Sequence, residues 1–338
     1  MNRKDFLSSV VPLITVSSAI AARKKINEEG SLKIPPYLKE GDIIGITCPS
    51  GFITQEEIQP AVLKLKEWGF QVKVGRTVGA KDFTFGGTDE LRTEDLQQML
   101  DDRDIDAILF GRGGYGAVRI IDNLDFTTFK KHPKWIIGFS DATVFHSHLS
   151  KIFGIASIHS KMCNSFPEEW SKAEPSQIET INSIRKCLTG EKMEYSVSVN
   201  EKNRVGTGEG ILTGGNLSIL QNLAGTKSDI TTKGKILFVE DTGEYLYSID
   251  RMFWNLKRTG KLDKLNGLII GGFKTKPDDT GEEFGRTVYD IVTEVVKEFS
   301  YPVCFDFPVG HQKNNYALKC GVRHELAVSD NSIVLNEV

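Results

Sequence analysis

The stretch Trp-Ile-Ile-Gly-Phe-Ser-Asp-Ala-Thr at residues 135–143 constrains the fold of this chain more than any other. Apolar, β-branched residues run up to Gly138 and give way, at Ser140, to a pattern typical of a helix start. A strand that turns sharply into a helix at a serine exposes that hydroxyl and aims the first helix amides at whatever it attacks. Such a turn needs small flanking residues, and Gly138 and Ala142 are small. The pattern predicts a nucleophile elbow at Ser140, with a plain helix N-cap as the open alternative.

Composition indicates an ordinary globular protein. Of the 338 residues, 39% are hydrophobic and 26% are charged, which is enough to build a full core without disulfides. A net charge of −3 and the lack of a basic stripe argue against a nucleic-acid partner. The five cysteines form no C-x-x-C pair and the six histidines no H-E-x-x-H pattern, which argues against a zinc site. We expect neither a metal nor an organic cofactor.

The amino-terminal segment has the features of an export signal. A short basic start precedes a mostly small and apolar run over 6–22, which contains Ala-Ile-Ala at 19–21 as a cleavage-like pattern. The alternative is an uncleaved membrane anchor, but about 16 apolar positions make a short span. We assign residues 1–22 to an export signal and predict a periplasmic protein with no integral membrane span when mature. A cytoplasmic location is the alternative.

From residue 36 onward, short apolar runs alternate with amphipathic helical patterns. The strands predicted in this part are 42–47, 70–74, 106–110, the run before Ser140, and 155–159. Intervening helices of about 10–15 residues indicate a parallel sheet covered on both faces. We assign 36–160 to an amino-terminal α/β domain that carries the serine.

After residue 160 the alternation becomes less regular. A helix over 177–188 is predicted to bridge two halves of the chain, and a long helix is expected over 283–299. Short β-rich segments and further helices lie between them. We assign 161–204 to a linker region and 205–338 to a carboxy-terminal domain of mixed topology.

A glycine cluster, Gly-Arg-Gly-Gly-Tyr-Gly at 111–116, follows a predicted strand and opens a helix. This placement suits a cradle of backbone amides for an anion. The spacing also matches G-x-G-x-x-G, but the strand before it is not the first of the fold, and Arg112 is unusual in a pyrophosphate loop. A dinucleotide site is therefore disfavoured. A tight turn that needs positive φ and an oxyanion-binding loop are the two interpretations that remain.

A serine nucleophile needs a base, and the base needs a carboxylate to orient it. Glu240 ends an apolar strand at 236–239, and His311 follows Phe-Pro-Val-Gly at 307–310. Either residue alone also fits the first solvated position after a strand. The order serine, acid, histidine is that of the α/β-hydrolases, although order alone does not establish a triad.

Six ordered motifs resemble those of the LD-carboxypeptidase family of serine peptidases, the murein tetrapeptide carboxypeptidases. They are GRGGYG at 111–116, GFSDAT at 138–143, TGGNL at 213–217, ILFVED at 236–241, DRM at 250–252 and GH at 310–311. The resemblance covers about residues 36–338. The chain departs from the family in having Phe139 where tyrosine is commoner, and in lacking a proline near Gly321.

The resemblance implies an α/β fold in two domains. The amino-terminal one is a flavodoxin-like parallel-sheet domain similar to class I glutamine amidotransferases, and the carboxy-terminal one is a swivelling β/β/α domain. It also implies a catalytic triad of Ser140, Glu240 and His311 in the cleft between them. Members of the family release the terminal D-alanine from L-Ala-D-Glu-diaminopimelate-D-Ala during cell-wall recycling.

The expected chemistry is acyl transfer, in which amides of Asp141 and of the Gly113–Gly114 turn hold the oxyanion. Arg112 is the candidate cation for the carboxylate of the leaving D-alanine, with a structural salt bridge as its alternative role. Tyr115 and Asn216 complete the predicted substrate-binding set. The expected partner is a murein peptide, and a homodimer is left open.

Two other functions compete with this one. Relatives similar to the microcin C immunity protein cleave acyl-adenylate compounds with the same triad, but those substrates are cytosolic and the export signal argues against them. A non-catalytic protein that binds peptidoglycan fragments is the other, and the three intact triad positions argue against it.

Overall fold

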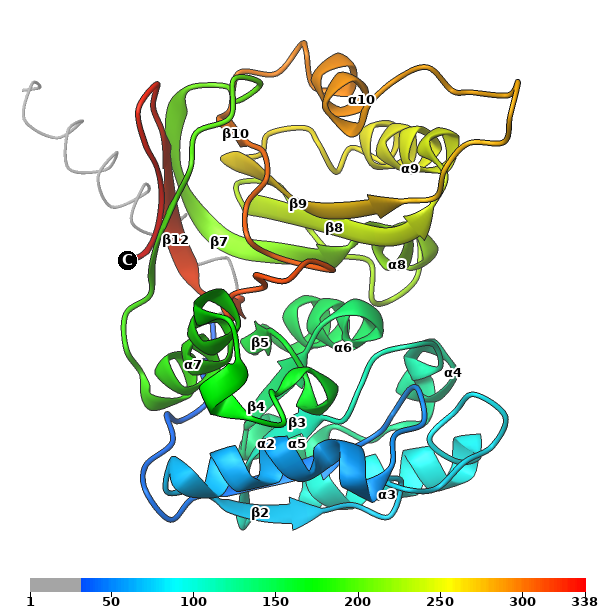
Figure 1. Ribbon diagram of the computed structural model, residues 1–338, viewed down its shortest axis with the longest axis vertical. Coiled ribbons are helices and arrows are strands. Elements are labelled where there is room, and N and C mark those ends of the chain that lie inside the picture. Colours follow the sequence, from blue (N-terminus) through cyan, green and yellow to red (C-terminus); the bar gives the residue numbers. More distant parts are fainter. Residues whose placement is uncertain (1–31) are drawn as a thin grey trace, which may run out of the picture.

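Two β-sheets, stacked one above the other in Figure 1, organise the molecule. The computed structural model describes residues 32–338, so the predicted export signal over 1–22 lies outside the described residues. The expected class is confirmed, because a mainly parallel sheet forms the amino-terminal half and a second sheet forms the carboxy-terminal half. Within residues 32–338, no helix has both the length and the apolar character needed to cross a membrane.

The first sheet has six strands in the order β11-β5-β4-β3-β1-β2. Its parallel strands are β1 (Ile43–Thr47), β2 (Gln71–Val74), β3 (Ile105–Phe110), β4 (Trp135–Gly138) and β5 (Ser157–His159). The chain runs from β1 to β2 on one side and then crosses to β3 on the other. The carboxyl ends of β1 and β3 therefore flank a switch in strand order, where α/β sheets usually bind their ligands.

Helices cover both faces of this sheet. They are α2 (Gln55–Glu67), α3 (Asp89–Asp101), α4 (Ala117–Ile120), α5 (Thr127–Lys131), α6 (Thr143–His148) and α7 (Pro175–Thr189). Trp135 and Ile137 of β4 belong to the apolar cluster formed with α2 and α7, while Ile136 belongs to the cluster formed with α3 to α6. Because side chains alternate along a strand and both faces are covered, the whole run before Ser140 is apolar.

The second sheet is half parallel and half antiparallel, in the order β10-β9-β8-β7-β12-β13-β6. The parallel strands are β7 (Gly206–Asn216), β8 (Ile236–Glu244), β9 (Gly267–Thr275) and β10 (Val303–Cys304). The antiparallel strands are β12 (Arg323–Val328), β13 (Ile333–Glu337) and β6 (Glu194–Val197). The helices of this half are α8 (Leu217–Asn222), α9 (Leu246–Arg258) and α10 (Val288–Val295). Figure 1 shows α9 and α10 beyond this sheet, away from the first one.

The helix expected over 283–299 is shorter in the structure, where α10 spans Val288–Val295. Gly285 has φ +71°, which lies outside the helical region and separates residues 283–284 from the helix. Thr287 then starts the helix with a capping box, because its side chain accepts from the Asp290 amide and Asp290 accepts from the Thr287 amide. The expectation was wrong because apolar spacing does not reveal where the backbone leaves the helical region.

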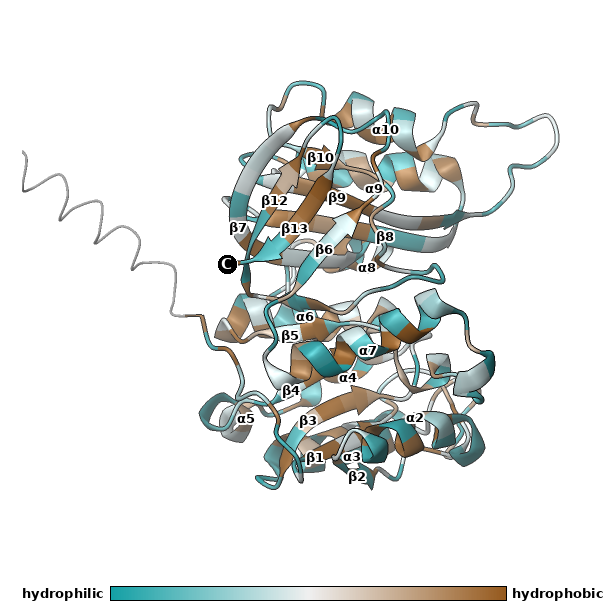
Figure 2. Ribbon diagram, turned by 60° about the vertical axis from the view of Figure 1, so that its left-hand side comes forward, coloured by the Kyte–Doolittle hydropathy of each residue, from teal (hydrophilic) through white to brown (hydrophobic). Residues whose placement is uncertain are grey.

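The carboxy-terminal part of the chain returns to the first sheet. Strand β11 (Leu318–Cys320) pairs antiparallel with β5, so that Leu318 lies opposite His159. One apolar cluster includes Ile137 and Ile158 of the first sheet, Phe238 of the second, and Leu318 between them. Figure 2 shows hydrophobic residues along the strands of both sheets. The two halves therefore share one core.

We predict that Leu318→Ala destabilises the whole molecule rather than one half. The side chain is fully buried in the shared cluster, so its loss leaves a cavity that lowers the free energy of unfolding by about 2–5 kcal/mol. Chemical denaturation followed by circular dichroism should show one transition at a lower midpoint. Leu63→Ala is the control, because Leu63 is 66% exposed and its truncation should change stability by about 0.5 kcal/mol or less. Two separate transitions in Leu318→Ala would contradict a shared core.

Candidate active site

Ser140 lies two residues beyond the end of β4, in a left-handed backbone conformation with φ 61°. Residues other than glycine rarely adopt this conformation, which costs about 1–3 kcal/mol and recurs at functional sites. A Cβ atom added to Gly138 would lie 3.0 Å from the Cβ atom of Ala142, so the turn does require small residues at both positions. The Ser140 hydroxyl contacts a histidine rather than a helix amide. These features are those of a nucleophile elbow and not of an N-cap.

Three side chains from different parts of the chain meet at this elbow. The Nε2 atom of His311 lies 3.1 Å from the Oγ atom of Ser140, and its Nδ1 atom lies 2.5 Å from Oε2 of Glu240. The same Oε2 atom accepts a hydrogen bond of 3.1 Å from the His311 backbone amide. Glu240 is fully buried, and His311 is partly exposed. The structure thus brings together the serine, acid and histidine that the sequence singled out.

Glycines and a bulge allow Glu240 and His311 to approach each other. Gly310 has φ +100°, and a Cβ atom on it would lie 2.4 Å from the Cβ atom of Glu240. Opposite the single residue Glu240, strand β9 has two residues, Gly271 and Gly272. The extra residue forms a β-bulge that shifts the register of the two strands. Bulges of this kind re-aim side chains next to active sites. The Gly310–His311 motif is therefore explained by the close approach of its loop to a buried carboxylate.

The glycine loop after β3 lies against the serine. A Cβ atom on Gly113 would lie 3.1 Å from the Cβ atom and 3.3 Å from the Oγ atom of Ser140. The Gly113 carbonyl accepts a hydrogen bond of 3.0 Å from the Gly51 amide, so the Gly114 amide of the same trans peptide points the other way. The Gly114 amide has no acceptor within residues 32–338. It can therefore donate to a bound anion.

The carboxylate of Asp141 holds the elbow to two neighbouring loops. It is buried, and its Oδ2 atom accepts from the Ser50 hydroxyl at 2.5 Å and from the Ala117 amide at 2.8 Å. Burial raises the pKa of Asp141, and these two hydrogen bonds oppose that rise. The loop after β1, the start of α4 and the elbow are thereby joined. No signal in the sequence indicated this contact, which joins residues 91 positions apart.

Asn216 lies at the boundary between the two halves. Its backbone amide donates to the Thr143 hydroxyl at 3.0 Å, just beyond the elbow. Its side-chain oxygen caps α8 by accepting from Ile219, and its side-chain nitrogen donates to Asp241 at 3.1 Å. Burial raises the pKa of Asp241 to about 6. Asn216, expected to bind substrate, is thus itself buried and engaged with the protein.

Arg112 and Tyr115 lie in the glycine loop. Arg112 donates to the Phe52 carbonyl at 3.2 Å, and within the described part of the chain it has no carboxylate partner. The salt bridge considered as its alternative role is therefore not formed with residues 32–338. The Tyr115 side chain is 54% exposed, and its ring lies 5.9 Å from that of Phe85.

Lys161 was missed by the sequence analysis. It follows β5, and its Nζ atom donates to the Gln312 carbonyl at 2.8 Å and lies 5.2 Å from the centre of the Phe139 ring. Burial is the main cause that lowers its pKa to about 8. Its position directly after a predicted strand, at the edge where parallel sheets bind ligands, was the available signal. No group of three His, Cys, Asp or Glu side chains in the described residues is arranged to hold a metal ion.

Comparison with known families decides which family this chain belongs to. Models of the LD-carboxypeptidase N-terminal domain and C-terminal domain match residues 44–160 and 209–326. The chain belongs to the LD-carboxypeptidase family. The resemblance seen in the motifs is therefore confirmed, and the protein is assigned to the hydrolases that act on peptide bonds.

Similar proteins include two kinds of LD-carboxypeptidase relative. A probable murein peptide carboxypeptidase of Bacillus subtilis is 29% identical over 303 residues, covering 89% of this chain and 93% of that protein. The crystal structure of muramoyltetrapeptide carboxypeptidase from Oxalobacter formigenes matches with a TM-score of 0.76 at 29% identity, covering 87% of this chain and 98% of that chain. The microcin C7 self-immunity protein MccF of Escherichia coli is 26% identical over 333 residues, covering 89% of this chain and 94% of that protein.

Proposed function

We propose that this protein is a serine-type LD-carboxypeptidase that releases the terminal D-alanine from the murein tetrapeptide L-Ala-D-Glu-diaminopimelate-D-Ala. The observation that carries the proposal is the arrangement of Ser140, strained to φ 61°, with His311 at 3.1 Å and the buried Glu240 behind it. The names of the similar Bacillus and Oxalobacter proteins support the murein peptide as substrate.

The mechanism is acyl transfer with an ester intermediate on Ser140. His311 accepts the Ser140 proton as the hydroxyl oxygen attacks the peptide carbonyl, and Glu240 holds the imidazole tautomer and stabilises the imidazolium. When the tetrahedral intermediate collapses, His311 gives the proton to the amine of the departing D-alanine. A water molecule, deprotonated by the same imidazole, then hydrolyses the ester and frees the shortened peptide.

The oxyanion receives hydrogen bonds from the Asp141 amide and from an amide of the Gly113–Gly114 turn. The closeness of Gly113 to Ser140 and the unpaired Gly114 amide support this role. One donor of this kind contributes roughly 3 kcal/mol to the transition state. Arg112 and Tyr115 are proposed to contact the rest of the peptide, with Arg112 supplying positive charge that no protein carboxylate neutralises within residues 32–338, whereas the buried Asn216 caps α8 and positions the elbow from behind.

Hydrolysis of acyl-adenylate compounds is the second candidate function, since the likeness to the microcin C7 self-immunity protein extends over 89% of the chain. The two functions share a triad and differ in the group that leaves. An assay that follows both a tetrapeptide and an aminoacyl sulfamoyl or phosphoramidate adenylate by mass spectrometry separates them. A protein that binds the tetrapeptide without cleaving it would instead be a binding protein.

We predict that Ser140→Ala lowers the turnover of the tetrapeptide by about 10⁴–10⁶-fold while the protein stays folded, because the nucleophile is lost. Released D-alanine measures the rate, and thermal unfolding checks the fold. Ser196→Ala, at an exposed position on β6, is the matched control and should keep the wild-type rate. Near-normal turnover by Ser140→Ala would show that another residue is the nucleophile.

We also predict that the enzyme prefers a terminal D-alanine to a terminal L-alanine. Inverting this centre moves either the methyl group into the wall or the carboxylate away from its partner. Losing a charge-assisted contact costs roughly 1.5–3 kcal/mol, so kcat/KM should fall about 10–150-fold. Matched tetrapeptides that differ only in the last stereocentre provide the comparison. Equal values would mean that the terminal residue is not recognised, and the adenylate substrates would then be tested first.

We propose that the protein is exported and acts outside the inner membrane, on the basis of the basic start and the apolar run over 6–22. Cleavage after Ala21 would give a mature chain that begins near Ala22 or Arg23. Amino-terminal sequencing of protein recovered from the periplasmic fraction should show this start. An intact Met1 on protein from the cytoplasmic fraction would argue for the cytoplasmic alternative.

A further inference from the structure

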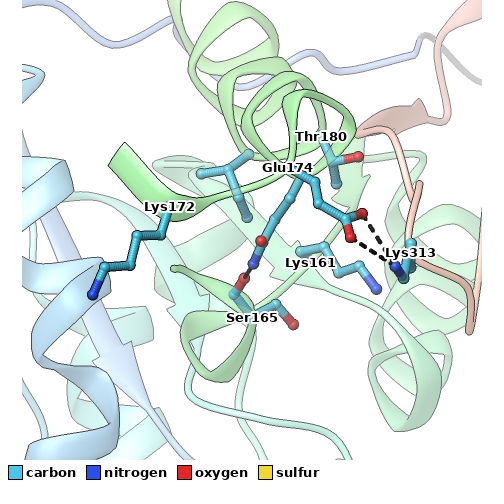
Figure 3. A pocket seen from close by; sticks show the side chains of 8 residues that line it. Lys161, Ser165, Lys172, Glu174, Thr180 and Lys313 are labelled. Carbon is cyan, nitrogen blue, oxygen red and sulfur yellow. Dashed lines mark hydrogen bonds and ion pairs between the residues drawn. The ribbon is translucent and has the colours of Figure 1, made fainter. Parts of the chain in front are cut away.

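A cavity of about 430 Å³ lies beside the loop that carries His311. Its walls come from the segment after β5, from α7 and the residues before it, and from the histidine loop. They include Lys161, Ser165, Glu174, Gln177 and Lys313. Figure 3 shows Lys161 pointing toward Lys313 and Glu174, whereas Lys172 extends away on the other side.

Among the described residues, Lys161 is the cation of this cavity that forms no ion pair with a carboxylate. Lys313 pairs with both oxygens of Glu174 at 2.9 and 3.1 Å, and Lys172 pairs with Glu169 at 2.7 Å. The Nζ atom of Lys161 instead donates to the neutral carbonyl of Gln312, and it forms no ion pair within residues 32–338. An ammonium group has three donors, so two of them remain for a ligand. Burying a cation without a counter-charge is costly, which favours an anionic ligand here.

The position of Lys161 indicates which part of a substrate it meets. A catalytic histidine passes its proton to the leaving amine, so the departing residue lies on the histidine side of the nucleophile. Lys161 bonds to Gln312, the residue after His311. It also lies against Phe139, whose ring centre is 4.9 Å from that of His311. The glycine loop that carries Arg112, by contrast, approaches Ser140 through Gly113. Lys161 is therefore the cation that lies on the histidine side, where the departing residue is expected.

We propose that Lys161 binds the terminal carboxylate of the substrate, that is, the carboxylate of the residue that leaves. This role is the one that the sequence suggested for Arg112. The inference rests on the proposed carboxypeptidase function and adds to it the residue that recognises a free carboxyl terminus. Such a cation favours bonds whose leaving residue carries a free α-carboxylate, as the terminal D-alanine does.

Binding through Lys161 predicts a pH dependence. Burial lowers its pKa to about 8, Lys274 of β9 lowers it further, and Glu240 of β8 opposes both. Lys313 and Glu174 face Lys161 across the cavity, and His159 of β5 lies near enough that Lys161 adds to the effect of burial in lowering the pKa of that histidine. The ammonium form is present below the pKa and is lost as the pH rises. For a substrate with a free carboxylate, kcat/KM should therefore decline through about pH 8.

The test compares the wild type with Lys161→Met on two peptides, the tetrapeptide and its carboxy-terminal amide. The wild type should prefer the free acid about 10–150-fold, mostly through KM, because the amide cannot form the ion pair. Lys161→Met should cleave the two peptides at nearly equal kcat/KM and lose the decline near pH 8. Lys161→Arg should keep the preference.

Lys134→Met is the matched control. Lys134 is also buried, burial lowers its pKa to about 8, and it also donates to backbone carbonyls. It precedes β4, however, and so lies at the opposite end of that strand from Ser140. Its variant should keep the full preference for the free acid. Cleavage of the amide by Lys161→Met at the wild-type rate shows that its fold and triad are intact. If Lys161→Met does not fold, the preference and pH profile of Lys161→Arg decide the question.

Three outcomes would overturn the inference. If the wild type is active and Lys161→Met still prefers the free acid as strongly, the role of Lys161 is overturned while the proposed carboxypeptidase function stands. A Lys161→Met enzyme that keeps this preference but no longer distinguishes diaminopimelate from lysine at the third position would assign Lys161 to the side-chain carboxylate instead. A wild type that cleaves neither peptide would overturn the proposed function, and the inference with it.

Discussion

One hydrogen bond, 3.1 Å long between His311 and Ser140, joins side chains that belong to opposite halves of the molecule. A shift of about 1 Å between the halves would separate the proposed nucleophile from its proposed base, and misplacements of that size cost enzymes about 10²-fold in rate. Contacts between the two halves fix their relative position. Strand β11 inserts Leu318 beside β5, and the Asn216 amide bonds to Thr143 just beyond the elbow. The shared core is therefore a requirement of the chemistry as well as a source of stability.

The strain at Ser140 has to be offset by its surroundings. A left-handed serine costs about 1–3 kcal/mol and would relax if its neighbours were free. Here the next residue, Asp141, is fixed by hydrogen bonds from the Ser50 hydroxyl and the Ala117 amide. A hydrogen bond to a charged group contributes about 1.5–3 kcal/mol to stability, which is similar to the cost of the strained conformation. The contacts that fix the elbow also fix the glycine loop, because Ala117 begins the helix after it. The proposed nucleophile and the proposed oxyanion donors are thus held by one buried carboxylate.

Features that depend on neighbouring residues in the sequence could be predicted from the sequence. The strands on both sides of Ser140, the helix over 177–188 and the serine, acid and histidine positions could all be found from hydrophobic periodicity and motif order. Strand β11 could not, because three residues at 318–320 carry no periodic signal and pair with residues about 160 positions away. The start of α10 depended on the φ angle of Gly285. Lys161 could not be singled out from the sequence because a lone lysine after a strand belongs to no motif. Its importance follows only from the folded structure, in which it lines a cavity beside the His311 loop.

The position of the acid shows how one strand serves two purposes. Side chains of β8 alternate, so Phe238 and Glu240 face the first sheet while Val239 and Asp241 face the helices of the second half. A register slip of one residue would exchange the two carboxylates. Aspartate, one methylene shorter, would then have to reach His311, and the amide of Ser218 would lose the partner that now lies 2.8 Å from it. The buried alternation of β8 and the two-glycine bulge opposite Glu240 therefore select which of two adjacent acids orients the histidine.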